Sequence, residues 1–204
     1  MSKTITRLFD SYSDAAAAVR ELENIGVPND DISIIANNVH GEHSNDHEGV
    51  NDHGDVTRGT STGAVLGGAG GLLAGLGLLA IPGLGPIVAA GWLAATAVGA
   101  GIGAAGGAAT GGIVGALKNA GHSEEDAHVY SEGVRRGGKL VSAKVADADV
   151  ARAEAVLDRV SSVDITQRGA SYRSSGWNGF DENAAAYTPE EIGRDREIHG
   201  LPRR

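Results

Sequence analysis

The sequence predicts an α+β protein: a ferredoxin-like βαββαβ sandwich interrupted between its second and third strands by a long glycine-rich helical hairpin and an extra helix. Two segments with a strand–helix–strand pattern carry this prediction, together with a charge-free block between them. No Asp, Glu, Lys, Arg or His lies between Arg58 and Lys118. The division that we expect is a split α+β domain at residues 1–36 and 121–168, a His- and Asp-rich polar linker at 37–61, an apolar helical hairpin at 62–118 and a mostly disordered tail at 169–204.

The first strand–helix–strand unit lies at the N-terminus. Thr4–Phe9 is rich in β-branched and apolar residues, which is typical of a strand. Ser11 and Asp14 have the spacing of a capping box, and the apolar residues that follow recur at intervals of three and four. Gly26 suits a left-handed helix end, and Asp31–Ala36 is the second predicted strand.

The second unit follows the charge-free block and is preceded by an extra helix. Ser123 and Asp126 form another candidate capping box at the start of that helix. Lys139–Val145 alternates as a strand, and Val150–Val160 carries a helical apolar face. Ser162–Gln167 is the last predicted strand, with apolar residues at every second position.

Two stretches of these units resemble a known family. "RLFDSYSDAAAAVRELENIGVPNDDISIIA" and, after the insert, "HVYSEGVRRGGKLVSAKV" are similar to the bacterial general stress protein 17M-like family, also called heat-induced stress protein domains. The resemblance covers roughly residues 4–36 and 121–168. It implies an association with bacterial stress, often with a glycine-rich hydrophobic insert, and it brings no catalytic residues.

Glycine recurs at every fourth position in two parts of the charge-free block. Residues four apart share one face of a helix, so each series predicts a side-chain-free groove that lets another helix backbone approach closely. Each interior glycine costs a helix about 0.5–1 kcal/mol relative to alanine, so a repeated register indicates a use. We interpret the segment as a glycine zipper that makes the chain a homo-oligomer. Its predicted helix-packing residues are Gly63, Gly67, Gly71, Gly75, Gly99, Gly103, Gly107, Gly111 and Gly115.

The length of the two halves indicates membrane association. Ala80–Ile87 contains two prolines and two glycines and predicts the turn. As a helix, Thr62–Ala80 would be about 28 Å long, close to the hydrocarbon core, and Ile87–Leu117 about 46 Å, which requires a tilt or a kink. No secretory signal is evident, so we expect the cytoplasmic face of the bacterial inner membrane, with membrane lipid as a partner. The alternative is a cytoplasmic protein whose hairpin is buried against its own sheet or a sister chain.

Composition excludes several classes of function. The net charge of −9 and the lack of a basic stripe argue against nucleic acid, and without cysteine there is no thiolate nucleophile. Imidazoles among carboxylates can bind divalent metals, but we interpret the linker as a solvated segment and expect no metal and no cofactor. The histidines concerned are His40, His43, His47 and His53.

Two further motifs have ordinary explanations. Arg135, Arg136 and Lys139 could hold an anion or a lipid headgroup, but cations near a helix C-terminus are common dipole partners, which we favour. "GIGAAG" at Gly101–Gly106 matches a dinucleotide fingerprint only by letters, because it lies within a predicted helix.

The tail combines a short predicted helix with isolated aromatic residues. Thr188 and Pro189 suit the start of a helix. The aromatic residues, which are docking anchors for a partner or tethers to the domain, are Trp177, Phe180 and Tyr187.

No nucleophile–base pair or twinned carboxylate stands in an apolar setting, so we expect no enzymatic activity and no catalytic or cofactor-binding residues. The sequence predicts a non-enzymatic, stress-associated protein: a cytoplasmic α+β domain on a self-associating, membrane-associated glycine-zipper hairpin. The alternative is a soluble regulatory module that binds a metal or a small ligand.

Overall fold

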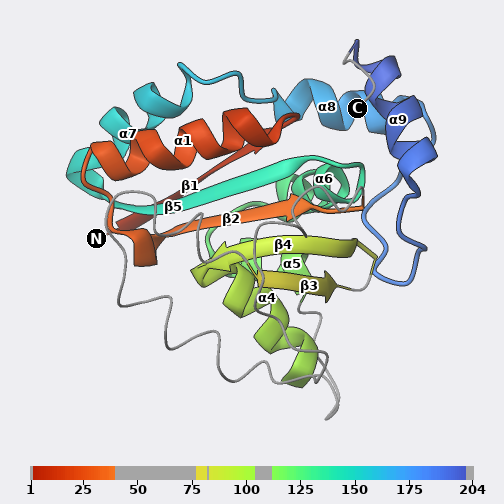
Figure 1. Cartoon of the computed structure of the whole chain (residues 1–204), viewed down its shortest axis with the longest axis horizontal. Coiled ribbons are helices and arrows are strands. Elements are labelled where there is room, and N and C mark those ends of the chain that lie inside the picture. The colour runs from red at the N-terminus through yellow and green to blue at the C-terminus, as the bar shows by residue number, and fades with distance from the viewer. Residues whose placement is uncertain (1, 40–76, 82, 104–111, 201–204) are drawn as a thin grey trace, which may run out of the picture.

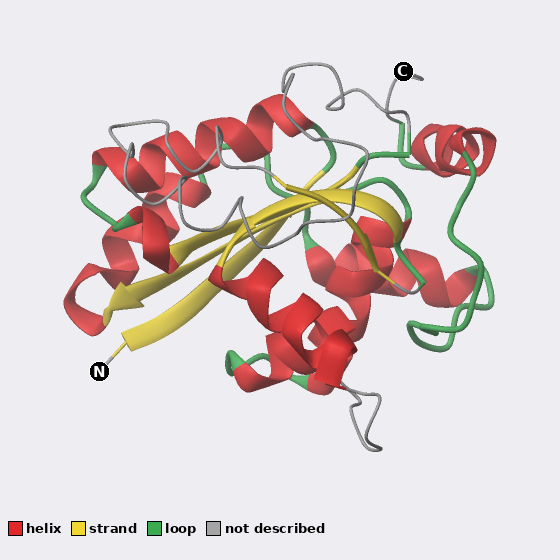
Figure 2. Ribbon diagram, turned by 60° about the horizontal axis from the view of Figure 1, so that its bottom comes forward, coloured by secondary structure: helices red, strands yellow, loops and turns green. Residues whose placement is uncertain are grey.

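The structure is a computed structural model that describes residues 2–39, 77–81, 83–103 and 112–200. Within these ranges, a five-stranded antiparallel sheet is combined with seven α-helices, so the predicted α+β class is confirmed. Helices lie on both faces of the sheet (Figure 1, Figure 2).

The sheet has the strand order β1-β5-β2-β4-β3. Its strands are β1 (Ser2–Phe9), β2 (Ile32–Asn37), β3 (Gly77–Ile81), β4 (Gly85–Gly91) and β5 (Lys139–Ala146). The helices are α1 (Tyr12–Asn24), α4 (Trp92–Gly103), α5 (Gly112–Asn119), α6 (Glu124–Arg135), α7 (Val150–Leu157), α8 (Ile165–Ser174) and α9 (Pro189–Ile198). Strands β1 and β2, which come from the first unit, pair with opposite sides of β5 from the second unit.

The helices α1 and α7 cover one face of the sheet, as the sequence predicts (Figure 1). Alternate residues of β1, such as Ile5 and Phe9, point into this layer and are buried with Leu22 of α1 and Leu157 of α7. The side chain of Ser11 accepts a hydrogen bond from the Asp14 amide and begins α1. The first unit therefore forms as its pattern indicates.

The other face of the sheet carries α4, α5 and α6. The intervening residues of the strands, including Leu8 and Leu140, are buried there with Leu93 of α4 and Leu117 of α5. The extra helix was predicted correctly, and the Ser123 side chain accepts from the Asp126 amide at its start. The sheet is thus the middle layer between two layers of helices.

The predicted turn at Ala80–Ile87 exists, but it joins two strands instead of two helices. Gly83 and Gly85 have φ angles of +76° and +78°, and the Leu84 amide donates to Ile81 O over 3.0 Å, which closes a β-hairpin. The helix expected from Ile87 begins only at Trp92, because residues 87–91 pair with β2. The described part of the expected helical hairpin therefore extends the sheet beyond β2.

The prediction of a strand at Ser162–Gln167 is wrong. Only Val163 makes a strand-like bond, from its amide to Leu8 O at 2.8 Å. The Asp164 carboxylate then accepts from the amides of Thr166 and Gln167 and caps α8, which begins at Ile165. A helix cap thus ends the extended segment after one hydrogen bond.

The tail contains two helices, where we expected mostly disorder. The helix predicted at its end is present as α9, with a complete capping box between Thr188 and Glu191. Tyr172 of α8, Phe180 in the connection and Ile192 of α9 are all buried. The tail packs against the end of the sheet beside α6 (Figure 1).

Candidate functional site

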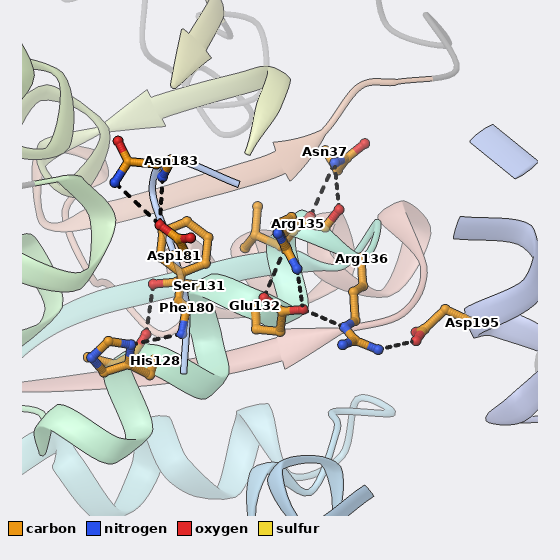
Figure 3. Close-up of polar contacts among 12 residues, drawn as sticks. Asn37, His128, Ser131, Glu132, Arg135, Arg136, Phe180, Asp181, Asn183 and Asp195 are labelled. Carbon is orange, nitrogen blue, oxygen red and sulfur yellow. Dashed lines mark hydrogen bonds and ion pairs between the residues drawn. The ribbon is translucent and has the colours of Figure 1, made fainter. Parts of the chain in front are cut away.

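The basic cluster at the C-terminal end of α6 is neutralised from within the chain (Figure 3). The Glu132 carboxylate has no solvent exposure and lies 3.0 Å from Arg135 Nε and 2.6 Å from Arg136 Nε. The Nη1 atom of Arg136 lies 2.7 Å from an oxygen of Asp195 on α9. Two carboxylates therefore balance two guanidinium groups.

Aromatic rings of the tail cover the same guanidinium groups. Arg136 lies 4.2 Å from the ring centroid of Tyr172, and Arg135 lies 4.8 Å from that of Tyr187. Burial alone would lower the pKa of Arg136, but hydrogen bonds to Asp195 and Glu132 outweigh it and raise the pKa above its ordinary value. The cations are thus held charged and covered.

The arrangement leaves no open anion site at these residues. Lys139, the third residue of the predicted basic cluster, is buried and donates to Gly137 O at 2.6 Å. The Asn37 side chain of β2 donates to Val134 O at the end of α6, so the strand end is tied to the cluster as well. We conclude that the cluster fastens α6, the sheet and the tail together.

A second set of contacts holds the tail to the end of β1. Arg168 of α8 forms two hydrogen bonds with the Asp10 carboxylate, at 3.0 and 2.8 Å, and Arg196 of α9 donates to Asp10 O. This bidentate geometry is the strongest that arginine makes with a carboxylate.

The tail aromatics act as tethers to the domain. Phe180 belongs to the core beneath α6, and its amide donates to His128 Nδ1 at 3.0 Å. The ring of Trp177 packs edge-on against Tyr172, and Tyr187 lies beneath the arginines of α6. Sequence reasoning missed Glu132, although its spacing of three and four residues from Arg135 and Arg136 is the spacing of helical ion pairs.

The second candidate site lies along the outer edge of β1. A cavity of about 450 Å³ is lined by the six residues Ser2–Arg7, with Ala120, Gly121, His122, Tyr130 and Glu154 on its other sides. At its base, Thr6 Oγ1 lies 2.7 Å from His122 Nε2 and 2.8 Å from Ser142 Oγ, while the Tyr130 hydroxyl donates to Thr6 O. The cavity is therefore polar.

This polar chain is not arranged for catalysis. Thr6 is 1% exposed and Ser142 is fully buried, so neither hydroxyl can reach a substrate. Burial lowers the pKa of His122, and the charge of Asp126 offsets this only in part, so the imidazole is neutral near pH 7. Burial likewise raises the pKa of Tyr130 to about 12. These groups satisfy one another and shape the cavity.

The other predicted site residues are placed only in part. His40, His43, His47 and His53, and Gly63, Gly67, Gly71, Gly75, Gly107 and Gly111, lie outside the described residues. Gly99 and Gly103 lie on α4 and Gly115 on α5, two helices that pack against each other. Gly101–Gly103, the first half of the dinucleotide-like motif, lie inside α4, which begins nine residues earlier at Trp92, so this part of the motif lacks the strand-to-helix turn that phosphate binding requires.

The described residues contain neither a metal-binding cluster nor a membrane-spanning helix. Across residues 2–39, 77–81, 83–103 and 112–200, no group of three or more His, Asp or Glu side chains is placed to hold a metal ion. In the same ranges, no helix has both the length and the apolar character needed to span a membrane. Comparisons with protein-family models, curated proteins and solved structures give no match.

Proposed function

We propose that this chain is a non-enzymatic, stress-associated protein that works by self-association, and that the uncharged glycine-rich segment of residues 62–118 supplies the contact. Its resemblance at residues 4–36 and 121–168 to the general stress protein 17M-like family supports the stress association. The contacts of the buried ionisable groups of α6 support a structural role, because Glu132 forms ion pairs with Arg135 and Arg136.

The placement of the glycine register on α4 is the observation that carries self-association. Leu93, Ala94 and Ala97 of α4 are buried on the sheet, whereas Ala95 is exposed. Residues 95, 99 and 103 follow one another at intervals of four, so the stripe that contains Gly99 and Gly103 starts on the face turned away from the core. The buried face of α4 meets the sheet and α5 of the same chain, and we propose that the stripe beginning at Ala95 meets a helix of another copy.

The same segment is our candidate for attachment to the cytoplasmic face of a bacterial membrane. Because residues 87–91 belong to β4, two helices that span the bilayer with a turn at 82–84 are incompatible with the sheet. We therefore propose peripheral attachment, with residues 62–76 and the outer face of α4 as the lipid contact. The uncharged stretch between Arg58 and Lys118 supports it.

We also infer that the sheet is a modified ferredoxin-like arrangement. Strands β1, β5 and β2 would hold the positions of the first, third and second strands, with α1 and α7 as the two helices of one layer. The hairpin β3–β4 then adds to β2, while among the described residues only the Val163 backbone bonds where a fourth strand would lie beside β1.

The experiment compares two double variants of the full chain. Gly99→Leu with Gly103→Leu puts bulky side chains on the stripe and should reduce oligomers in chemical crosslinking and light scattering. Gly99→Ala with Gly103→Ala is the matched control: it also raises helix propensity, by roughly 1 kcal/mol per site, but keeps the stripe small and should keep the oligomers. A monomeric wild-type chain, or equal loss of oligomers in both variants, would refute the proposal.

Lipid attachment has a separate measurement. Wild-type protein should co-sediment with vesicles of bacterial lipid and be released by an alkaline wash, as peripheral proteins are. Protein that stays in the supernatant with vesicles present would refute attachment and leave the self-association proposal standing.

A further inference from the structure

We propose that the outer edge of β1 is a second self-association surface, on which β1 of another copy adds as an antiparallel strand around a twofold axis at Thr4. The two five-stranded sheets would become continuous. The interface is separate from the glycine-rich contact proposed above and does not rest on it.

The backbone groups of alternate β1 residues point away from the sheet. The carbonyl of Leu8 accepts from the Val163 amide, and that of Thr6 accepts from the Tyr130 hydroxyl, so both face away from β5. Because strand residues alternate, the N–H and C=O groups of Ser2 and Thr4 face the same way. Within the part of the chain that the structure describes, hydrogen bonds on this side reach only Thr6 and Leu8, and the Thr4 backbone is unpaired there.

The space beside this edge is open to another strand. The cavity of about 450 Å³ follows all six residues from Ser2 to Arg7. The connection after α7 meets β1 only at Leu8, through Val163, before α8 turns away. The open stretch of this edge therefore ends at Thr6, whose carbonyl already accepts from the Tyr130 hydroxyl and from Arg7 Nη1.

Charge selects the register of this pairing. Lys3, Ile5 and Arg7 share one face of β1, and like charges directly opposite each other destabilise a strand pair. A twofold axis at Ile5 would set Lys3 against Arg7 of the other copy, and an axis at Lys3 would set the two Lys3 residues against each other. Within the chain, Lys3 lies 3.3 Å from Glu154 and Arg7 lies 3.3 Å from Asp158. Ion pairs at the surface are weak and offset this repulsion only in part, so both registers are less favourable.

An axis at Thr4 avoids these conflicts. It sets Lys3 against Ile5 of the other copy and the two Thr4 residues against each other, with both hydrogen bonds of that pair formed. The Thr6 amide then donates to the Ser2 carbonyl of the other copy, while the Thr6 carbonyl keeps its bonds from Tyr130 and Arg7. An axis at Thr6 would instead require the Leu8 carbonyl, which already accepts from Val163.

A second copy of this chain is the occupant that these features fit. In the register centred on Thr4 the edge pairs with itself without setting like charges directly opposite each other, and a twofold contact closes without leaving the same edge free. An extended peptide of another protein would need no twofold register, so the test distinguishes the two occupants.

The test uses the absence of cysteine from the natural chain. In a hydrogen-bonded antiparallel pair the Cα atoms are about 5.5 Å apart, within the roughly 4.4–6.8 Å that a disulfide spans. The full-length Thr4→Cys variant should therefore form a covalent dimer under mild oxidation, seen as a band of twice the monomer mass on a denaturing non-reducing gel.

Ser2→Cys is the matched control. Ser2 is exposed and on the same face as Thr4, but around an axis at Thr4 its counterpart is Thr6. The two introduced cysteines would then be four residues apart along the strands, roughly 13 Å, which is too far to bridge. Selective dimerisation of Thr4→Cys supports the proposal. The proposal is overturned if Thr4→Cys forms no covalent dimer, or if both variants form covalent dimers to the same extent.

A combined variant separates this interface from the glycine-rich contact. Thr4→Cys should still cross-link when Gly99→Leu and Gly103→Leu are also present. Loss of the cross-link in that combination would overturn the separate β1 interface, whereas loss of higher oligomers alone would concern only the glycine-rich contact.

Discussion

Replacing Glu132 by glutamine should be one of the most destabilising isosteric changes in this chain. Glu132 Oε2 lies 3.0 Å from Arg135 and Oε1 lies 2.6 Å from Arg136, and the side chain is fully buried. Glutamine keeps the size but removes the charge, and its NH₂ group faces a guanidinium donor. Arg136 then retains only Asp195 as an anionic partner.

The magnitude follows from the burial of the partners. Removing one member of a buried ion pair costs about 3–5 kcal/mol, because the other charge is left uncompensated. The two arginine side chains are 12% and 11% exposed and keep a little contact with water, and the glutamine oxygen can still accept one hydrogen bond. We therefore expect a loss of about 3 kcal/mol in the free energy of unfolding, near the lower limit of that range.

Urea denaturation of the full chain measures this loss, with Glu124→Gln as the control on the same helix. Glu124 also forms an ion pair, with Lys118 at 2.9 Å, but its side chain is 67% exposed, and exposed pairs contribute little to stability. Proteolysis of the α8–α9 region should also become faster in Glu132→Gln alone, since Glu132 positions the arginine that binds α9. Equal losses in the two variants would refute the argument from burial.

Two further predictions concern the edge of β1 and the end of β4. Burial lowers the pKa of His122 in the folded state, so the unfolded chain takes up its proton first as the pH falls. The free energy of unfolding should therefore decrease from about pH 7 downward through 6.5. Urea unfolding across this pH range should show a shallower decrease for His122→Asn. Gly91 has a φ of +89°, and a Cβ atom there would lie 2.1 Å from Ile32 O, so Gly91→Ala should cost more than the roughly 1–2 kcal/mol of left-handed strain alone. Gly26→Ala is its control in thermal unfolding, because Gly26 has a φ of +91° and no neighbour within 4 Å; equal losses would contradict the close approach to β2.

Elements with local signals were predictable from the sequence. Ser11 and Ser123 mark helix starts because each side chain can accept from an amide three residues later, whatever the rest of the fold does. The strands β1, β2 and β5 have apolar residues on both faces, and their lengths are those of strands. In the structure β1 and β2 pair with opposite sides of β5.

The hairpin β3–β4 was not predictable from periodicity alone. Short apolar runs beside Pro and Gly are compatible with strands or with a buried helix, and the glycine register from Gly99 onward favoured helix for the whole block. What decides the outcome is the free edge of β2, which residues 87–91 fill, and this lies outside any local pattern. Asp164 did carry a local signal, because Gln167 three residues later completes a capping pattern.

The structure of the tail depends on contacts distant in sequence. Thr188 and Pro189 indicate where α9 begins, but nothing near them shows that Asp195 meets an arginine of α6 or that Arg196 meets the end of β1. Such residues are typical of a solvated segment, and only the fold supplies their partners. The candidate site on α6 was therefore predictable only in part. Its cations are neighbours in the sequence, but one of its two anions, Asp195, lies about sixty residues away.

The two sides of the sheet explain how association can remain limited. An exposed strand edge is a template for open-ended pairing, which proteins restrict with charged residues. On one side the chain adds its own β4 and β3 to β2, and on the other side Lys3 and Arg7 stand four residues apart on β1. Glu154 and Asp158 pair with these cations within the chain, but pairings centred on Lys3 or Ile5 would still set the cations of two copies directly opposite each other, whereas the proposed pairing centred on Thr4 would not. The charges on β1 thus permit one closed twofold pairing and disfavour the registers on either side of it.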